Sequence, residues 1–128
     1  MEEKIKYWLE LSDYDLDTAQ AMLRSKRYLY VGFMCHQVIE KIFKAYYVKL
    51  KSSNAPFTHS LSFLAKKGGF SHALTEEQTN FIDQIEPLNI ETRYPAHQKT
   101  LLKRLTKSKC EELLKTTENL QKWTKMQL

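Results

Sequence analysis

A chain of 128 residues with 42% hydrophobic and 27% charged residues has the size and composition of one globular domain, which argues against wholesale disorder. No apolar run reaches the roughly 18 residues of a membrane-spanning helix, and the first residues lack the basic-then-apolar order of a signal peptide. The net charge is +5. Because two cysteines are too few for a disulfide scaffold, we expect a cytoplasmic protein with free thiols and no membrane association.

The first half of the chain predicts two long helices and a short one. Residues 4–24 and 28–50 carry apolar side chains at three-to-four spacing, and the second apolar set is broad enough for a central helix packed on two sides. Turn-forming residues predict a loop over 51–57. Thr58 is the expected N-cap of a short helix that runs to about Lys67 and is ended by Gly68-Gly69.

Capping signals and prolines divide the second half. Residues 75–78, Thr-Glu-Glu-Gln, have the form of a capping box and predict a helix that Pro87 ends. We expect residues 88–96 to be irregular and one final helix to span about 98–125. Short loops favour antiparallel neighbours, so the predicted fold is an all-α bundle, with residues 1–128 forming a single domain.

A few polar residues interrupt the apolar run of the predicted second helix. Glu40 and Lys44 are four residues apart and can form a helical ion pair, and Gln37 and Lys41 line up on the adjacent row. These residues are either the one hydrated strip of a central helix or the polar floor of a cleft. His59, expected as the second residue of the short helix, is interpreted as structural, bonding a local carboxylate or stabilising the turn.

Motifs for metal binding and for phosphate loops are absent. The four histidines and two cysteines lack the paired short spacings of zinc sites, so we expect no metal or other cofactor, and Cys35 is expected to pack as a small apolar residue. Gly68-Gly69 follows a predicted helix rather than a strand, which leaves phosphate cradling unsupported.

Positive charge is concentrated in the last third of the chain. From Arg93 onward there are nine basic and three acidic residues, whereas residues 1–92 carry a net charge of −1. This asymmetry indicates either a polyanionic or acidic partner, or simply a solvated, lysine-rich helix face.

Four sequence elements stand in order along the chain: Trp8 with Asp15-Leu16-x-x-Ala19, His36-Gln-x-x-Glu-Lys-x-x-Lys-Ala45, Thr58-His59-x-Leu61-x-x-Leu64, and Thr92-Arg93-Tyr94-Pro95. In this order they resemble the HEPN domain (higher eukaryotes and prokaryotes nucleotide-binding) over about residues 5–123. The resemblance implies an antiparallel bundle of four to five helices, usually a homodimer. It also implies nucleotide or RNA binding, often beside a minimal nucleotidyltransferase in a two-component toxin–antitoxin pair.

Many proteins of the family that the chain resembles are metal-independent ribonucleases, with an Arg, four to six residues and then a His as their signature. A His can move a proton at the ribose 2′-hydroxyl, and an Arg fork can stabilise charge on the scissile phosphate. Here the one close pair is Arg93 and His97, with three residues between them, Pro95 included. The pair departs from the signature and leaves open whether the protein is an enzyme.

The favoured hypothesis is a non-catalytic or weakly catalytic nucleotide- or RNA-binding module. Its alternatives are an RNase toxin that uses Arg93 and His97, and a protein–protein adaptor without catalysis. In the favoured hypothesis the second helix supplies the cleft floor, and Arg93 with the basic strip that follows contacts phosphate. The predicted ligand-binding residues are Gln37, Glu40, Lys41, Lys44, Arg93, Tyr94, Lys99, Lys103 and Arg104. Lys107 extends the same strip.

Overall fold

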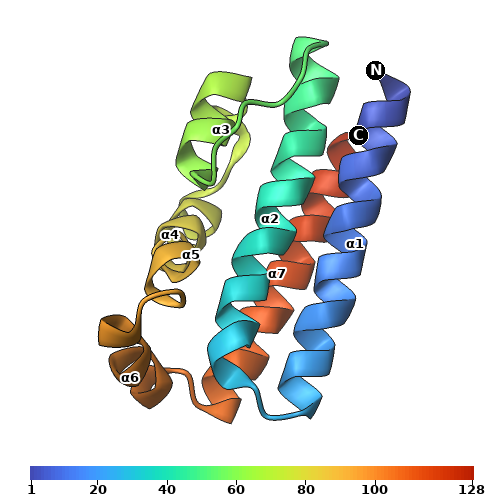
Figure 1. Ribbon diagram of the computed structural model, residues 1–128. Coiled ribbons are helices and arrows are strands. Elements are labelled where there is room, and N and C mark those ends of the chain that lie inside the picture. Colours follow the sequence, from blue (N-terminus) through green and yellow to red (C-terminus); the bar gives the residue numbers. More distant parts are fainter.

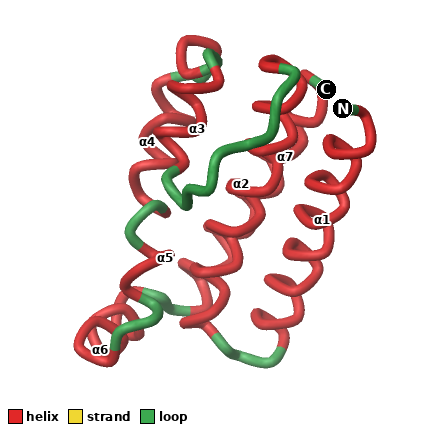
Figure 2. Tube along the Cα trace, turned by 45° about the horizontal axis from the view of Figure 1, so that its top comes forward, coloured by secondary structure: helices red, strands yellow, loops and turns green.

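The computed structural model describes residues 1–128 and consists of helices joined by short connections, which confirms the all-α prediction (Figures 1 and 2). No helix is both long and apolar enough to cross a membrane. The elements follow one another in the order α1 (Glu2–Arg24), α2 (Tyr28–Lys51), α3 (Leu61–Gly68), a 3₁₀ turn (Ser71–Ala73), α4 (Glu76–Ile85), α5 (Leu88–Glu91), α6 (Pro95–Arg104) and α7 (Lys107–Gln127).

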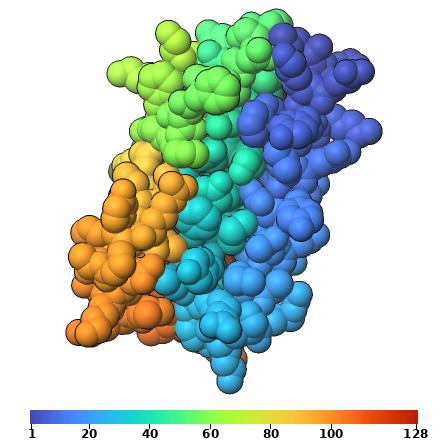
Figure 3. Space-filling model, in the orientation of Figure 1, coloured from blue at the N-terminus to red at the C-terminus, as the bar shows by residue number.

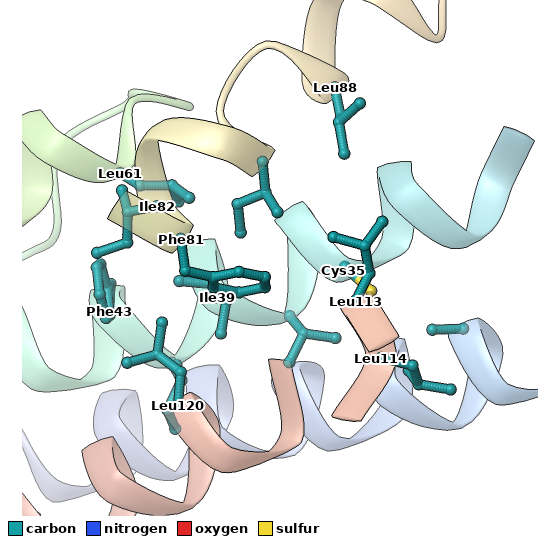
Figure 4. Packing of buried hydrophobic residues seen from close by; sticks show 14 of the residues in the cluster. Cys35, Ile39, Phe43, Leu61, Phe81, Ile82, Leu88, Leu113, Leu114 and Leu120 are labelled. Carbon is teal, nitrogen blue, oxygen red and sulfur yellow. The ribbon is translucent and has the colours of Figure 1, made fainter. Parts of the chain in front are cut away.

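Three long helices, α1, α2 and α7, lie side by side, and the shorter helices α3 to α6 run along the other flank of α2 (Figure 1). The central position of α2 follows from its broad apolar surface, because helices pack against it on more than one side. Ile39 and Phe43 of α2 meet Phe81 of α4 and Leu120 of α7 in the core (Figure 4). Full burial of side chains of this size contributes about 1.5–3 kcal/mol each.

The flank formed by α5 and α6 approaches α2 at a glycine. A Cβ atom at Gly32 would lie 3.1 Å from Cδ1 of Leu88 and 3.5 Å from Cδ1 of Leu105, so the absence of a side chain makes room for both leucines. Helix α6 itself buries one side chain, Leu101. The remainder of α6 faces away from the core.

Two helix starts show how local capping compares with prediction. The capping box at Thr75 is present, since Gln78 N donates to Thr75 Oγ1 at 3.0 Å and Thr75 N donates to Gln78 Oε1 at 2.9 Å. The prediction of Thr58 as an N-cap is wrong, because Ser60 Oγ accepts from Phe63 N and α3 starts two residues later. Glu86 fixes this later start, since its carboxylate accepts from the first backbone N–H groups of α3.

The predicted final helix over 98–125 is divided into α6 and α7. Leu105 is buried with non-helical dihedrals of φ −88° and ψ 67°, and Thr106 Oγ1 then caps α7 by accepting from Lys109 N at 3.2 Å. The stretch 88–96, predicted to be irregular, contains the short helix α5 and the first turn of α6. The break between α6 and α7 therefore lies at the buried Leu105 and the N-cap Thr106 and involves no proline.

Candidate functional site

A cavity of about 310 Å³ lies between the start of α2 and the connection from α5 to α6. It is lined by Tyr30, Phe33, Thr92, Arg93 and Gln98. Pro95 occupies the first turn of α6 and holds the preceding Tyr94 in an extended conformation, with φ −110° and ψ 123°. The chain therefore turns directly after Arg93, so that Arg93 and Gln98 line the cavity from the two sides of this turn.

Arg93 is held in this cavity by a buried amide and an aromatic ring. Its Nη2 donates to Asn89 Oδ1 at 3.2 Å, and its guanidinium carbon lies 5.5 Å from the centre of the Phe33 ring. Gln37 Nε2 donates to the same Asn89 oxygen at 3.3 Å. A guanidinium has five N–H donors, so most of them remain available to a ligand.

Thr92 lines the same cavity and carries a buried hydroxyl without a partner. The residue is 3% exposed, and its Oγ1 makes no hydrogen bond in the protein. Its carbonyl oxygen is satisfied, since Gln98 Nε2 donates to it at 2.8 Å. A buried hydroxyl without a partner costs about 1–3 kcal/mol, and a small movement of the cavity wall would be needed to expose it to a ligand.

The other predicted residues of this region lie outside the cavity lining. Tyr94, Lys99 and Lys103 are exposed, and Arg104 is ion-paired with Glu91 at 3.1 Å. His97 is exposed in the first turn of α6, and no hydrogen bond joins its ring to Arg93. Their roles in ligand binding or catalysis stay predictions.

The polar residues of α2 fall into two groups. Lys41 Nζ donates to Gln37 Oε1 at 3.0 Å and to Asp15 Oδ2 of α1 at 3.2 Å. Because Gln37 also bonds Asn89, a continuous chain of hydrogen bonds runs from Arg93 across α2 to α1. Gln37 thus joins the Arg93 cavity indirectly, as a support for Asn89.

The second group is a buried network around Glu40. The Glu40 side chain is 2% exposed, and its Oε2 accepts from Lys44 Nζ at 3.2 Å, as the helical spacing predicts. Its Oε1 accepts from Nδ1 of His59 at 2.9 Å. His59 lies in the loop over 52–60 rather than in a helix, and its carboxylate partner is distant in sequence instead of local. The loop crosses α2 at this point (Figure 2), and Glu40 and Lys44 are buried instead of forming a hydrated strip.

His36 of α2 also contacts the loop over 52–60, through the backbone of His59. It is 0% exposed, and its Nε2 lies 2.9 Å from the carbonyl oxygen of His59, which can only accept. The proton is therefore on Nε2, and Nδ1 is left as an acceptor 3.5 Å from Gln37 Nε2. Burial lowers the pKa of His36 to about 4, although the negative charge of Glu40 opposes the shift.

Sequence reasoning missed Asn89, Phe33 and Gln98. The spacing of Asn89 and Arg93, four residues apart, is a helical signal, but the stretch between them was predicted to be irregular. Phe33 precedes Gln37 by one helical turn, which could have placed both on the face of α2 that meets Arg93.

Comparison with known proteins gives one family and one solved structure. The family model of the HEPN domain matches residues 5–127. The structure is similar to the crystal structure of TT1696 from Thermus thermophilus, with a TM-score of 0.83, 21% sequence identity and 98% of each chain covered. At this identity the likeness concerns the fold alone. No curated protein matches the sequence.

Proposed function

The chain belongs to the HEPN domain family, and on that premise we propose that it is a nucleotide- or RNA-binding module whose ligand places a phosphate in the Arg93 cavity. The observation that carries the proposal is that one cavity is lined both by an exposed guanidinium bonded to Asn89 and by a threonine whose hydroxyl has no partner. Arg93 is fixed by Asn89 at 3.2 Å, and Thr92 Oγ1 has no partner.

The chemistry of the lining fits a phosphate ester of a nucleoside. A guanidinium fork matches phosphate oxygens in geometry and charge, and a hydroxyl can donate to a further oxygen. Tyr30 and Phe33 offer aromatic rings beside the cation, on which a base can stack. The exposed Lys99 and Lys103 add positive charge to α6, the helix that also supplies Gln98 to the cavity.

The test measures binding of adenosine monophosphate and of a short single-stranded RNA by calorimetry and fluorescence anisotropy. Arg93→Gln should weaken binding at least about tenfold, because a charge-assisted hydrogen bond is worth about 1.5–3 kcal/mol. The matched control is Arg24→Gln, which removes the same charge at an exposed residue of α1 outside the cavity lining. Equal losses in both variants would mean that only general charge matters and would overturn this placement.

Thr92→Val separates binding from folding. Valine keeps the shape of threonine but removes a hydroxyl that has no partner in the free protein. We therefore expect unchanged or raised thermal stability together with a several-fold loss of affinity. Unchanged affinity would remove Thr92 from the proposed site.

We further propose that the protein is a homodimer that works with a minimal nucleotidyltransferase in a two-component, toxin–antitoxin-like system. Light scattering measures the mass of the free protein, and a value of one chain at micromolar concentration would contradict the dimer. Co-expression with a nucleotidyltransferase encoded beside it, followed by size-exclusion chromatography, tests the partnership. Separate elution of the two proteins would contradict it.

The alternative of a metal-independent ribonuclease rests on the exposed, unbonded imidazole of His97 near Arg93 in the chain. Incubation with a mixed RNA pool in EDTA, with wild-type protein and His97→Ala, decides between the two. Cleavage that leaves 2′,3′-cyclic phosphate ends and is lost in the variant would make the protein an enzyme. No cleavage together with no affinity for nucleotide or RNA would favour the adaptor alternative.

A further inference from the structure

A second cavity lies at the end of the molecule away from Arg93, between the start of α1 and the loop after α2. It has a volume of about 280 Å³ and is lined by Lys4, Tyr7, Trp8, Asn54, Ala55 and Phe57. Figure 3 shows the first turns of α1, in dark blue, against the green segment that follows α2. None of these residues belongs to the site described above.

Three of the six lining residues are aromatic, and their exposure is unusual. The Phe57 side chain is wholly exposed and Tyr7 is more than half exposed. The Tyr7 and Trp8 rings meet edge to face, with centroids 5.2 Å apart and planes at 72°. Large aromatic rings left in water around one cavity mark a surface that a flat, aromatic ligand can cover.

The polar part of the lining selects for negative charge. Lys4 is the one charged lining residue, and its Nζ donates to the side-chain oxygen of Asn54 across the cavity mouth. By contrast, Lys41 and Lys44 of α2 are paired with carboxylates. The ammonium of Lys4 has an amide partner alone, and the Asn54 amide keeps its N–H donors for a ligand.

Both walls of the cavity are held by the same buried carboxylate. Lys44 bonds Glu40 and places its Nζ 5.0 Å from the centre of the Trp8 ring, which fixes the α1 wall. His59 bonds the other oxygen of Glu40 and so fixes the loop that carries Phe57. The backbone of both walls therefore loses little conformational freedom when a ligand binds, whereas the wholly exposed Phe57 side chain becomes ordered.

We propose that this cavity binds a small planar anion of one or two fused aromatic rings. The ring system lies among Tyr7, Trp8 and Phe57, and the carboxylate or phosphate group contacts Lys4 and the amide of Asn54. This site is independent of the Arg93 cavity, and its ligand differs from the polyanion proposed there.

The test uses 2-naphthoate as the probe, with the uncharged 2-naphthylmethanol and the non-aromatic cyclohexanecarboxylate as comparisons. The indole N–H signals of the two tryptophans report binding in ¹H–¹⁵N spectra of the full chain, with Trp123 as the internal control outside the cavity. 2-Naphthoate should shift the Trp8 signal saturably and leave that of Trp123 in place. The alcohol should bind about two- to fivefold more weakly, since it cannot pair with Lys4, and cyclohexanecarboxylate should cause no shift.

Two variants and two controls locate the site. Phe57→Ala should weaken 2-naphthoate binding about fivefold or more and Lys4→Gln about two- to fivefold, and neither side chain belongs to the buried core. Phe63→Ala removes a half-exposed phenylalanine outside the cavity lining and should leave binding unchanged, as should Arg93→Gln. No saturable Trp8 shift at about 10 mM probe, equal binding of the acid and the alcohol, or a shift that persists in both cavity variants would overturn the proposal.

Discussion

Acidification should destabilise this protein through one buried histidine, His36. Its pKa is lowered from the ordinary 6.5 to about 4, chiefly by burial; Glu40, the hydrogen bond to the His59 carbonyl and Glu86 oppose the shift, and the charge of the His59 ring adds to it. The folded state therefore holds His36 neutral over a pH range in which the unfolded chain binds a proton. The contribution to stability is complete above pH 6.5, decreases as the pH falls, and is lost near pH 4.

The size of this effect follows from the shift. A change from 6.5 to about 4, at about 1.4 kcal/mol per unit, gives about 3 kcal/mol of stability lost between neutral pH and pH 4. A comparison between wild type and a variant that lacks this titrating group isolates the contribution of His36.

The assay is urea unfolding followed by circular dichroism at several pH values from about 7.5 to 4. His36→Gln keeps an N–H that can donate to the carbonyl oxygen of His59 but does not titrate. Over this pH range the free energy of unfolding of the variant should decrease by about 3 kcal/mol less than that of wild type. The exposed His72 provides the control, and His72→Gln should follow the wild-type curve. Parallel curves for wild type and His36→Gln would refute the reasoning.

Three further predictions concern the fold. Glu40→Ala should cost about 3–5 kcal/mol in urea unfolding, because it leaves Lys44 buried without its counter-charge; a cost below about 1 kcal/mol would show that the network contributes little. Thr106→Ala removes the N-cap of α7 and should cost about 1 kcal/mol in the same assay, and an unchanged midpoint would contradict the observed cap. Burial raises the pKa of Cys35 to about 12 and that of Cys110 to about 11, so both thiols should resist an aromatic disulfide reagent until the protein unfolds. Rapid reaction of the folded protein would be inconsistent with that burial.

The elements that the sequence predicted well are those with local signals. The apolar periodicity located α1 and α2 to within about two residues, and the capping box at Thr75 located the start of α4. The break between α6 and α7 was missed, because Leu105 continues the apolar spacing and Thr106 looks like any threonine inside a helix. At the break, Leu105 is buried beside Gly32, a contact that is distant in sequence.

The candidate site was only partly predictable for the same reason. Arg93 and Gln37 were both predicted as ligand-binding residues, but Asn89, the residue that connects them, was not. Asn89 lies 52 positions after Gln37 in the sequence and reaches it only because α5 packs on α2. That Thr92 Oγ1 is buried without a hydrogen-bond partner likewise depends on how the helices pack. Chemistry-bearing residue types can be read from a sequence, whereas buried partners and their absence depend on the folded structure.

The thin attachment of α6, with Leu101 as its one buried side chain, has a consequence for how the Arg93 cavity works. A segment with so little buried surface opens by local unfolding at a lower free energy than the bundle, so its amides exchange with solvent first. Gln98, which closes one side of the cavity, belongs to this segment. Affinity for a ligand at Arg93 therefore includes the free energy of closing α6, and a substitution at Leu101 weakens binding without touching the ligand.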